Sequence, residues 1–180
     1  MPRNTPSGFT LVELVILIVV LGIIAAVGIP RFIDISRQTL VATIEATAAS
    51  FQNAVIPMQA NVTAKGTSRP SNNVVGFGDG TVDINTAGFP TDTTSANPVN
   101  NDTVTSAKCL NIWNGILQNP PAVTTSAAVY STAAPQLYRA QVAGAGITLL
   151  CRYTYRKVAN PVRRFDYYVN TGRIITTIPP

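Results

Sequence analysis

The sequence predicts an α+β protein in which one long N-terminal α-helix is followed by a roughly four-stranded antiparallel sheet. Three features indicate this class. Residues 9–30 are almost entirely apolar, residues 31–65 repeat apolar side chains at helical spacing, and the stretches from residue 136 onward alternate apolar and polar side chains as strands do. We expect the apolar half of the helix to protrude and the amphipathic half to pack on the sheet.

The composition excludes several functional classes. The 180 residues suit one domain, and charged residues make up 12%, against roughly 25% in ordinary soluble domains. The chain has no His, so it lacks the commonest general base and the commonest transition-metal ligand. Charge is uneven: residues 1–102 hold five basic and seven acidic side chains, whereas residues 103–180 hold eight basic side chains and one acid, Asp166.

The apolar run is long enough to cross a membrane. Residues 14–30 carry no charge, and Glu13 is the one charge in residues 9–30. As a helix, residues 9–30 would span about 33 Å, enough for the ~30 Å hydrocarbon core of a bilayer. Gly22 and Pro30 weaken the helix. We therefore expect this part to melt locally when copies pack together, or to be only kinked in a single chain.

Residues 31–65 should continue the same helix with one apolar face. The predicted buried face consists of Ile33, Leu40, Ile44, Phe51, Val55 and Met58. The predicted exposed face consists of Asp34, Arg37, Gln38, Thr43, Glu45 and Gln52. Gly66 is a suitable C-cap, which places the helix end near Ala64 or Lys65. Pro57 should bend the helix or loosen its preceding turn.

Residues 66–107 are rich in Gly, Pro, Asn, Thr and Ser, which predicts a long connecting loop with one short strand at Thr81–Ile84. A short helix follows at Lys108–Gln118, with Leu110, Trp113 and Leu117 on one face. The acids of the loop lack the alternate spacing of a calcium-binding loop, so no metal site is predicted. These acids are Asp79, Asp83, Asp92 and Asp102.

The last part of the chain predicts four antiparallel strands. Their expected ranges are Gln136–Val142, Ile147–Arg156, Phe165–Val169 and Arg173–Ile178, and residues 108–180 would form the globular head. In the second strand, Cys151 shares a face with Ile147, Leu149 and Tyr153. Residues 143–146 and 170–172 supply turns. Laid across the amphipathic helix, these strands would bury both apolar faces.

The two cysteines, Cys109 and Cys151, lie far apart without CxxC spacing. Behind an N-terminal apolar segment, this pattern indicates export to an oxidising compartment and one disulfide. The bond would close a loop of about 43 residues and contribute about 4 kcal/mol in the chain-entropy treatment. It would fasten the short helix to the sheet.

Glu13 needs an explanation, because a charge near the centre of a bilayer costs at least about 2.5–3.5 kcal/mol. A secretory signal peptide cut near Ala25–Val27 would have a shorter apolar run, and a plain membrane anchor would leave the carboxylate without a purpose. If the chain is cut between Gly8 and Phe9, the new amine lies one helical turn from Glu13. The carboxylate could then pair with the amine of its own copy or of an adjacent copy.

The stretch GFTLVE at residues 8–13, with Arg3 in a polar leader before it and the apolar run after it, resembles the processing signature of type IV pilins and related pseudopilins. Gly22 and Pro30 also fall where that family places a Gly and a Pro. Four further stretches resemble the mannose-sensitive haemagglutinin-type pilins: PRFIDIS, GDGTVDINTAGFPTDT, CLNIWNGILQ and CRYTY together with FDYYVNTGRI.

The resemblance implies removal of residues 1–8 by a prepilin peptidase, N-methylation of Phe9 and packing of the apolar helices into a filament core. Glu13 would engage the Phe9 amine of a neighbouring subunit. The implied protein is a structural pilus subunit for adhesion, biofilm formation or twitching motility, with no cofactor. Its implied partners are further copies of itself, the peptidase, an inner-membrane assembly platform, minor pilins and a host or abiotic surface.

The resemblance also implies a single-pass precursor in the inner membrane that later joins an extracellular pilus. A minor pilin or a type II secretion pseudopilin is an alternative within the same machinery. A further alternative is a DNA-uptake pilin that uses its basic head, because tyrosines are interleaved with basic residues there. The candidate anion-binding residues are Arg152, Arg156, Lys157, Arg163 and Arg164.

An enzyme is not predicted. No P-loop is present, and the glycines of residues 76–80 lack the strand–turn–helix context of a nucleotide-binding fingerprint. Ser and Thr are abundant but have no base beside them.

Overall fold

The computed structural model describes residues 8–66, 70–78, 80–94, 104–128, 130, 131, 133 and 135–179, and it leaves the side chains of residues 30, 33 and 34 undescribed. The chain divides into two compact units, a first unit, Met1–Ala42, and a second unit, Thr43–Pro180. The division falls inside the long helix α1, Leu11–Ala64. The predicted leader lies outside the described residues, apart from Gly8.

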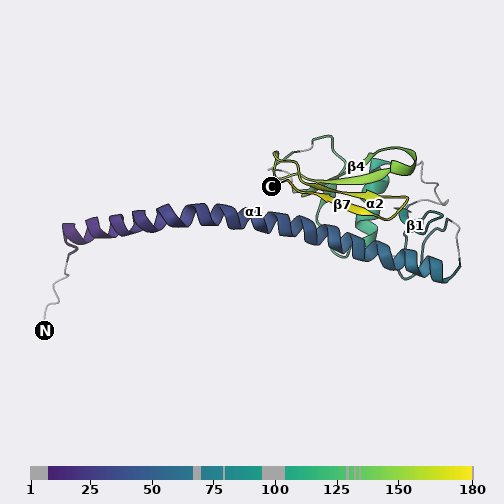
Figure 1. Cartoon of the computed structure of the whole chain (residues 1–180), viewed down its shortest axis with the longest axis horizontal. Coiled ribbons are helices and arrows are strands. Elements are labelled where there is room, and N and C mark those ends of the chain that lie inside the picture. The colour runs from purple at the N-terminus through teal and green to yellow at the C-terminus, as the bar shows by residue number, and fades with distance from the viewer. Residues whose placement is uncertain are drawn as a thin grey trace, which may run out of the picture. The chain divides into compact units, whose positions relative to one another are not determined.

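Helix α1 is unbroken through Pro30 and Pro57 (Figure 1). It ends at Ala64, and Gly66 follows in the left-handed region at a φ of 65°, donating its N–H to the Thr63 carbonyl at 3.1 Å. The prediction of Gly66 as the C-cap is therefore confirmed. A glycine suits this position because it adopts a positive φ without steric cost.

In the second unit, α1 presents its apolar face to the core as predicted. Ile44, Phe51 and Val55 are fully buried and Met58 nearly so. Among the residues predicted for the opposite face, those described are exposed: Arg37, Gln38, Thr43, Glu45 and Gln52. Leu40, in the first unit, is half-buried, and the predictions for Ile33 and Asp34 lie outside the described side chains.

The segment predicted as a loop with one strand contains a small hairpin. Strand β1, Asp83–Ile84, pairs antiparallel with β2, Pro90–Asp92. The sequence did not reveal β2, because a three-residue strand starting at a proline shows no periodicity. Asn85 holds the hairpin in place by donating Nδ2–H to the Val169 carbonyl at 2.8 Å and accepting the N–H groups of Ala87 and Phe89.

Helix α2 spans Ser106–Ile116, two residues earlier at each end than predicted. Thr105 is its N-cap, since its hydroxyl accepts the Lys108 N–H at 3.3 Å. The buried face consists of Cys109, Ile112, Trp113, Gly115 and Ile116, whereas the predicted Leu110 and Leu117 are half-buried. The face is thus rotated slightly from the predicted one.

The main sheet has five strands in the order β3-β4-β5-β6-β7. Strands β4 (Tyr138–Ala143), β5 (Leu150–Tyr155), β6 (Arg164–Tyr168) and β7 (Ile174–Thr177) pair antiparallel, which confirms the predicted four-stranded core. The short β3, Val123–Thr124, adds a fifth strand that pairs parallel with β4.

The predicted strand start at Ile147 is wrong. Gly146–Thr148 forms a 3₁₀ turn, and Ile147 is 84% exposed instead of sharing the buried face of Cys151. Thr148 closes this turn by donating its hydroxyl to the Ala145 carbonyl at 2.8 Å. Ile147 and Thr148, which the alternation of apolar and polar residues had assigned to the strand, therefore belong to the turn.

The core of the second unit is aromatic. The Phe51 ring of α1 lies 5.2 Å from both the Tyr153 and Tyr167 rings, and the Trp113 ring of α2 lies 4.9 Å from that of Tyr153. The predicted disulfide between Cys109 and Cys151 is confirmed and joins α2 to β5, with its Cα atoms 5.4 Å apart. Both helices therefore pack on one face of the sheet.

Candidate functional site

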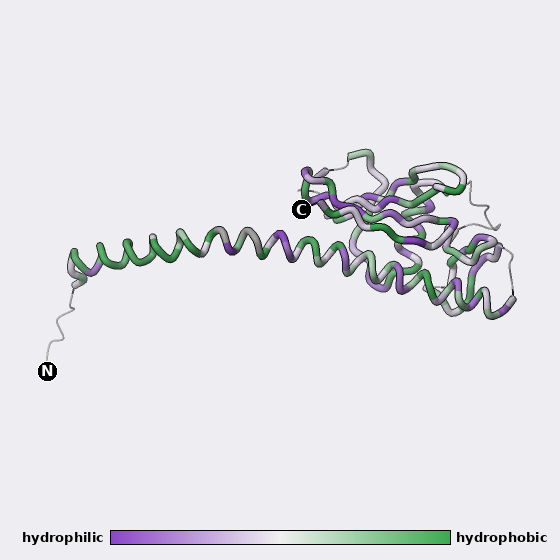
Figure 2. Tube along the Cα trace, in the orientation of Figure 1, coloured by the Kyte–Doolittle hydropathy of each residue, from purple (hydrophilic) through white to green (hydrophobic). Residues whose placement is uncertain are grey.

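The candidate assembly segment is the start of α1. Residues Leu11–Ile29 form a 19-residue stretch long and apolar enough to cross a membrane, judged by length and composition. Its large apolar side chains are 43–80% exposed in the single chain. Figure 2 shows this part of α1 as almost uniformly hydrophobic. Burial of one such side chain in lipid or against a neighbour is worth about 1.5–3 kcal/mol, so the segment favours either environment strongly over water.

Thr10 fixes where α1 begins. Its hydroxyl accepts the Glu13 backbone N–H at 3.2 Å, and its carbonyl accepts the Leu14 N–H at 3.2 Å. Thr10 is therefore the N-cap, and Glu13 occupies the third helical position, as in the Ser/Thr-x-x-Glu capping box. This role was not predicted from the sequence, although the pattern Thr-Leu-Val-Glu before an apolar run is its usual signal.

The predicted processing site lies immediately before the helix. Gly8 and Phe9 are exposed and non-helical, and the Phe9 side chain is 74% exposed. The Gly8–Phe9 bond is thus accessible in the described part of the chain. The Glu13 carboxylate lies within the first turn of α1 and is exposed as well, where a negative charge is favoured by the helix dipole.

The two helix-weakening residues lie within an unbroken helix. A Cβ built on Gly22 would meet no atom within 4 Å, so no contact within the described chain requires a glycine there. The Pro30 backbone is helical, and its side chain is outside the description. Whether these residues melt the helix in a filament stays a prediction.

The five candidate anion-binding residues do not form one exposed patch. Arg156 and Arg163 are only 3% and 4% exposed, and Lys157 is half-buried. Arg152 donates two hydrogen bonds to Asp166, at 2.9 and 2.8 Å, and these bonds raise the pKa of Arg152 above its ordinary value. Arg164 Nε lies 3.9 Å from the same carboxylate. The binding of DNA by this set of residues stays a prediction.

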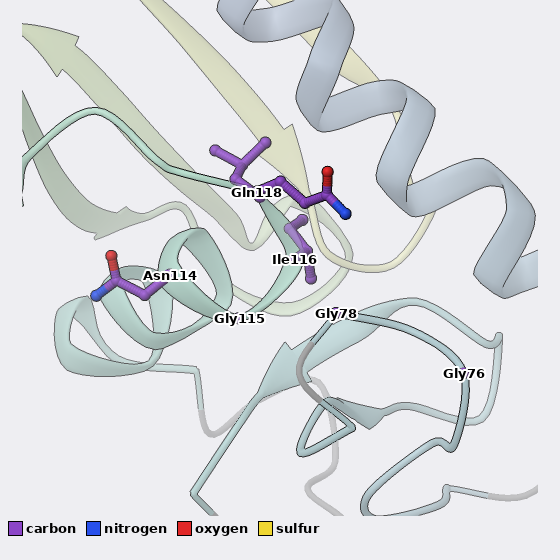
Figure 3. A pocket seen from close by; sticks show the side chains of 7 residues that line it. Gly76, Gly78, Asn114, Gly115, Ile116 and Gln118 are labelled. Atoms are coloured by element: carbon purple, nitrogen blue, oxygen red, sulfur yellow. The ribbon is translucent and has the colours of Figure 1, made fainter.

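The described residues offer no metal centre, and one of their cavities lies beside the glycine-rich residues 76–78. They contain no group of three or more His, Cys, Asp or Glu side chains placed to hold a metal, while Asp79 and Asp102 lie outside the description. A cavity of about 480 Å³ lies between residues 76–78 and the end of α2 (Figure 3). Its seven described lining residues include no titratable side chain.

Glycines shape this cavity. A Cβ on Gly78 would lie 1.9 Å from the Gly115 carbonyl oxygen, and a Cβ on Gly115 would lie 2.4 Å from Thr93 Cγ2. Of the glycines in residues 76–80, Gly78 therefore allows its loop to pack closely against α2, whereas a Cβ on Gly76 or Gly80 would meet no atom within 4 Å.

Comparison with known proteins gives one partial match. Over 60 residues the chain is 48% identical to the type IV narrow pilus major component PilA5 of Thermus thermophilus. The match covers 33% of this chain and 50% of the relative, so the chain spans about half the length of the curated relative that it matches. No protein-family profile matches the chain, and no solved structure matches it.

This match relates the chain to a type IV pilin, and its α+β architecture, with a long apolar N-terminal helix, a sheet and one disulfide, is the one that the resemblance predicts. The comparison supports the broad class of type IV pilins and carries nothing specific to the mannose-sensitive haemagglutinin-type subfamily.

Proposed function

We propose that this chain is a non-enzymatic structural subunit of a type IV pilus filament. The observation that carries the proposal is the exposed apolar stretch Leu11–Ile29, which continues as one helix into a disulfide-bonded unit. The partial similarity to a pilus major component supports the same conclusion. Such a stretch is stable in a membrane before assembly and among the helices of other copies afterwards.

In the proposed maturation, a prepilin peptidase removes residues 1–8 and the amine of Phe9 is methylated. The accessible, non-helical Gly8–Phe9 bond supports this step. The precursor is an inner-membrane protein with a single span, and the mature chain joins an extracellular filament through the assembly platform and minor pilins. On the four further stretches of resemblance, we assign it to the mannose-sensitive haemagglutinin-type subfamily.

In the filament, Glu13 pairs with the Phe9 amine of a neighbouring copy. The position of Glu13 supports this role, because Thr10 holds it in the first turn of α1, next to the site where the amine would appear. In a low-dielectric surrounding, an unpaired carboxylate raises the free energy. Pairing with the amine would therefore stabilise one particular axial offset between neighbouring copies. Adhesion, biofilm formation and motility would follow from the assembled filament.

The test compares filament yields. Glu13→Ala should leave the protein in the membrane fraction but lower the yield of filaments, counted by electron microscopy, at least tenfold. Glu45→Gln removes an exposed acid elsewhere on α1 and serves as the matched control, with an unchanged yield expected. Normal filaments from the Glu13→Ala chain would contradict the pairing role. Mass spectrometry of the mature chain should show N-methylated Phe9 at its start, and an intact Met1 would remove the assignment.

A further inference from the structure

The outer face of the main sheet, which points away from both helices, is defined by the strand register. Tyr153 and Phe165 pack on the core, where their rings lie 4.9 and 5.9 Å from that of Trp113. Side chains alternate between the two faces of a strand, and directly paired residues share a face. Arg152 and Arg164, one residue away from these aromatics, therefore lie on the outer face.

The pairing between strands gathers arginines on this face. Arg139 of β4 and Arg164 of β6 both pair with Thr154 of β5, one on each side. At the next outward position along the strands, Arg152 of β5 pairs with Asp166 of β6. Arg173 pairs with Tyr168, because its carbonyl accepts the Tyr168 N–H at 2.8 Å, one position beyond the pair of Tyr167 and Ile174. Tyr168 shares a face with Asp166, so Arg173 lies on the outer face as well. We call Arg139, Arg152, Arg164 and Arg173 the basic sheet face.

The basic sheet face carries an excess of positive charge. Asp166 is the one acid among the outward residues of β4 to β7, and Arg152 occupies both of its oxygens. Arg164 Nε lies 3.9 Å from Asp166 and is buried without a hydrogen bond, while the Arg164 side chain as a whole is 32% exposed. Arg173 is exposed. Four guanidinium groups against one carboxylate leave a net charge of about +3 on one face of the sheet.

The arginines also shape the surface between them. Thr154 is only 4% exposed, although it faces outward with Arg139 and Arg164 on either side. Long arginine stems cover apolar and small neighbours while their charged ends reach solvent. Arg139 is held by donating Nε–H to the Ser126 carbonyl at 2.8 Å and by a second bond to Gln141. The guanidinium groups are therefore partly fixed before any ligand arrives.

We propose that the basic sheet face binds nucleic acid through its phosphate groups, independently of base sequence. Neighbouring strands lie about 4.8 Å apart and successive outward residues about 7 Å apart, so the four arginines, which span three strand spacings and two outward steps, cover about 14 by 14 Å. That length corresponds to about four base pairs at 3.4 Å each. The planar guanidinium group matches phosphate in a two-bond geometry, which favours an all-arginine face for this ligand.

A second feature favours nucleic acid over an acidic polysaccharide. Tyr168 lies on the same outer face as Asp166 and is half-exposed beside Arg173. An aromatic ring among arginines offers a stacking surface for bases, which an acidic polysaccharide does not carry. The proposal goes beyond filament formation, because the whole face belongs to the second unit and can act in a single chain.

The basic sheet face differs from the basic set read from the sequence. Arg163 pairs with Tyr155, since the Tyr155 N–H donates to its carbonyl at 2.9 Å, and so it shares the core side of the sheet. Arg156 and Arg163 are almost fully buried. The register instead adds Arg139 and Arg173, which lie outside the basic cluster in the sequence.

The test measures the binding of the full chain, in nonionic detergent, to a fluorescent 20-base-pair DNA duplex at several salt concentrations. Contacts by Arg139, Arg164 and Arg173, which do not share the two-bond pair of Arg152 with Asp166, predict a slope of log K against log salt of about −2.7, or about −0.9 for each contact. Arg164→Gln with Arg173→Gln should reduce the size of this slope by about 1.8 and weaken binding at least tenfold. Arg37→Gln with Lys65→Gln removes two exposed charges from α1 and the residue after its end, and it should leave the slope unchanged.

Three outcomes would overturn the proposal: equal losses in both double variants, no loss in the sheet variant, or displacement of the chain by polygalacturonate more readily than by unlabelled DNA. Asp166→Asn should act in the opposite direction and tighten DNA binding, because it frees Arg152 from its carboxylate partner. An unchanged affinity of the Asp166→Asn chain would count against DNA binding by the basic sheet face. The Glu13→Ala chain should bind DNA as the wild type does. Assembly and DNA binding can therefore fail separately.

Discussion

Tyr138 should make the second unit less stable at alkaline pH, and its replacement by Phe should remove a defined part of that loss. The side chain is 1% exposed, its ring lies 4.9 Å from that of Trp113, and its hydroxyl donates to Thr47 Oγ1 at 3.3 Å. Burial raises the pKa of Tyr138 from 10.0 to about 12. The folded state thus holds the phenolic proton more tightly than the unfolded chain does.

The size of the effect follows from linkage. The contribution of Tyr138 is fully present below pH 10 and is lost as the pH rises from 10 to about 12, because the unfolded chain loses its proton first. One pKa unit corresponds to about 1.4 kcal/mol, so moving from pH 9 to pH 11 should cost about 1.3 kcal/mol through this residue. Tyr153 and Tyr167 are fully buried with pKa values raised well above 10.0, so they add a loss that both proteins share.

The assay is urea unfolding of the full chain and of Tyr138→Phe in nonionic detergent at pH 9 and pH 11. Trp113 is the sole tryptophan of the chain and is fully buried, so its fluorescence reports the midpoint. At pH 9 the variant should be less stable by about 1 kcal/mol, because it lacks the bond to Thr47. At pH 11 this advantage of the wild type should disappear.

A stability gap between wild type and Tyr138→Phe that is the same at both pH values would refute the reasoning. It would mean that the hydroxyl titrates alike in the folded and unfolded states. An increase of the gap at pH 11 would reverse the sign of the predicted linkage.

Two further predictions concern the packing of the second unit. Gly172→Ala should lower the free energy of unfolding by about 2–4 kcal/mol in urea titrations, because its φ is 65° and a Cβ would lie 2.2 Å from the Phe89 ring. Gly66→Ala has the same φ with no atom within 4 Å, so it should cost only about 1–2 kcal/mol, and equal costs would exclude the Phe89 clash. Cys109→Ala with Cys151→Ala should cost about 4 kcal/mol, and a reductant should destabilise the wild type but not this variant.

Local signals in the sequence predicted the helical part of the protein well. The apolar spacing that identified Ile44, Phe51 and Val55 is a property of neighbouring turns of one helix, and Gly66 ends that helix through its own backbone freedom. The disulfide could also be predicted from the sequence, because the chain contains only two cysteines.

Strand boundaries depended on contacts that no local pattern encodes. Ile147 continues the alternation of β5 in the sequence, yet it belongs to a 3₁₀ turn that Thr148 closes with its hydroxyl. Strands β2 and β3 have three and two residues and exist only because partners lie beside them. Such short strands have no periodicity to recognise.

The candidate sites divide in the same way. The sequence by itself determined the candidate assembly segment, because its apolar length, Glu13 and the predicted Gly8–Phe9 processing site are consecutive along the chain. Only the tertiary structure decided which basic residues share a surface. Pairing of β4, β5 and β6 sets Arg139 and Arg164 on either side of Thr154 and turns Arg163 toward the core, because a shift of one residue in a strand exchanges its two faces.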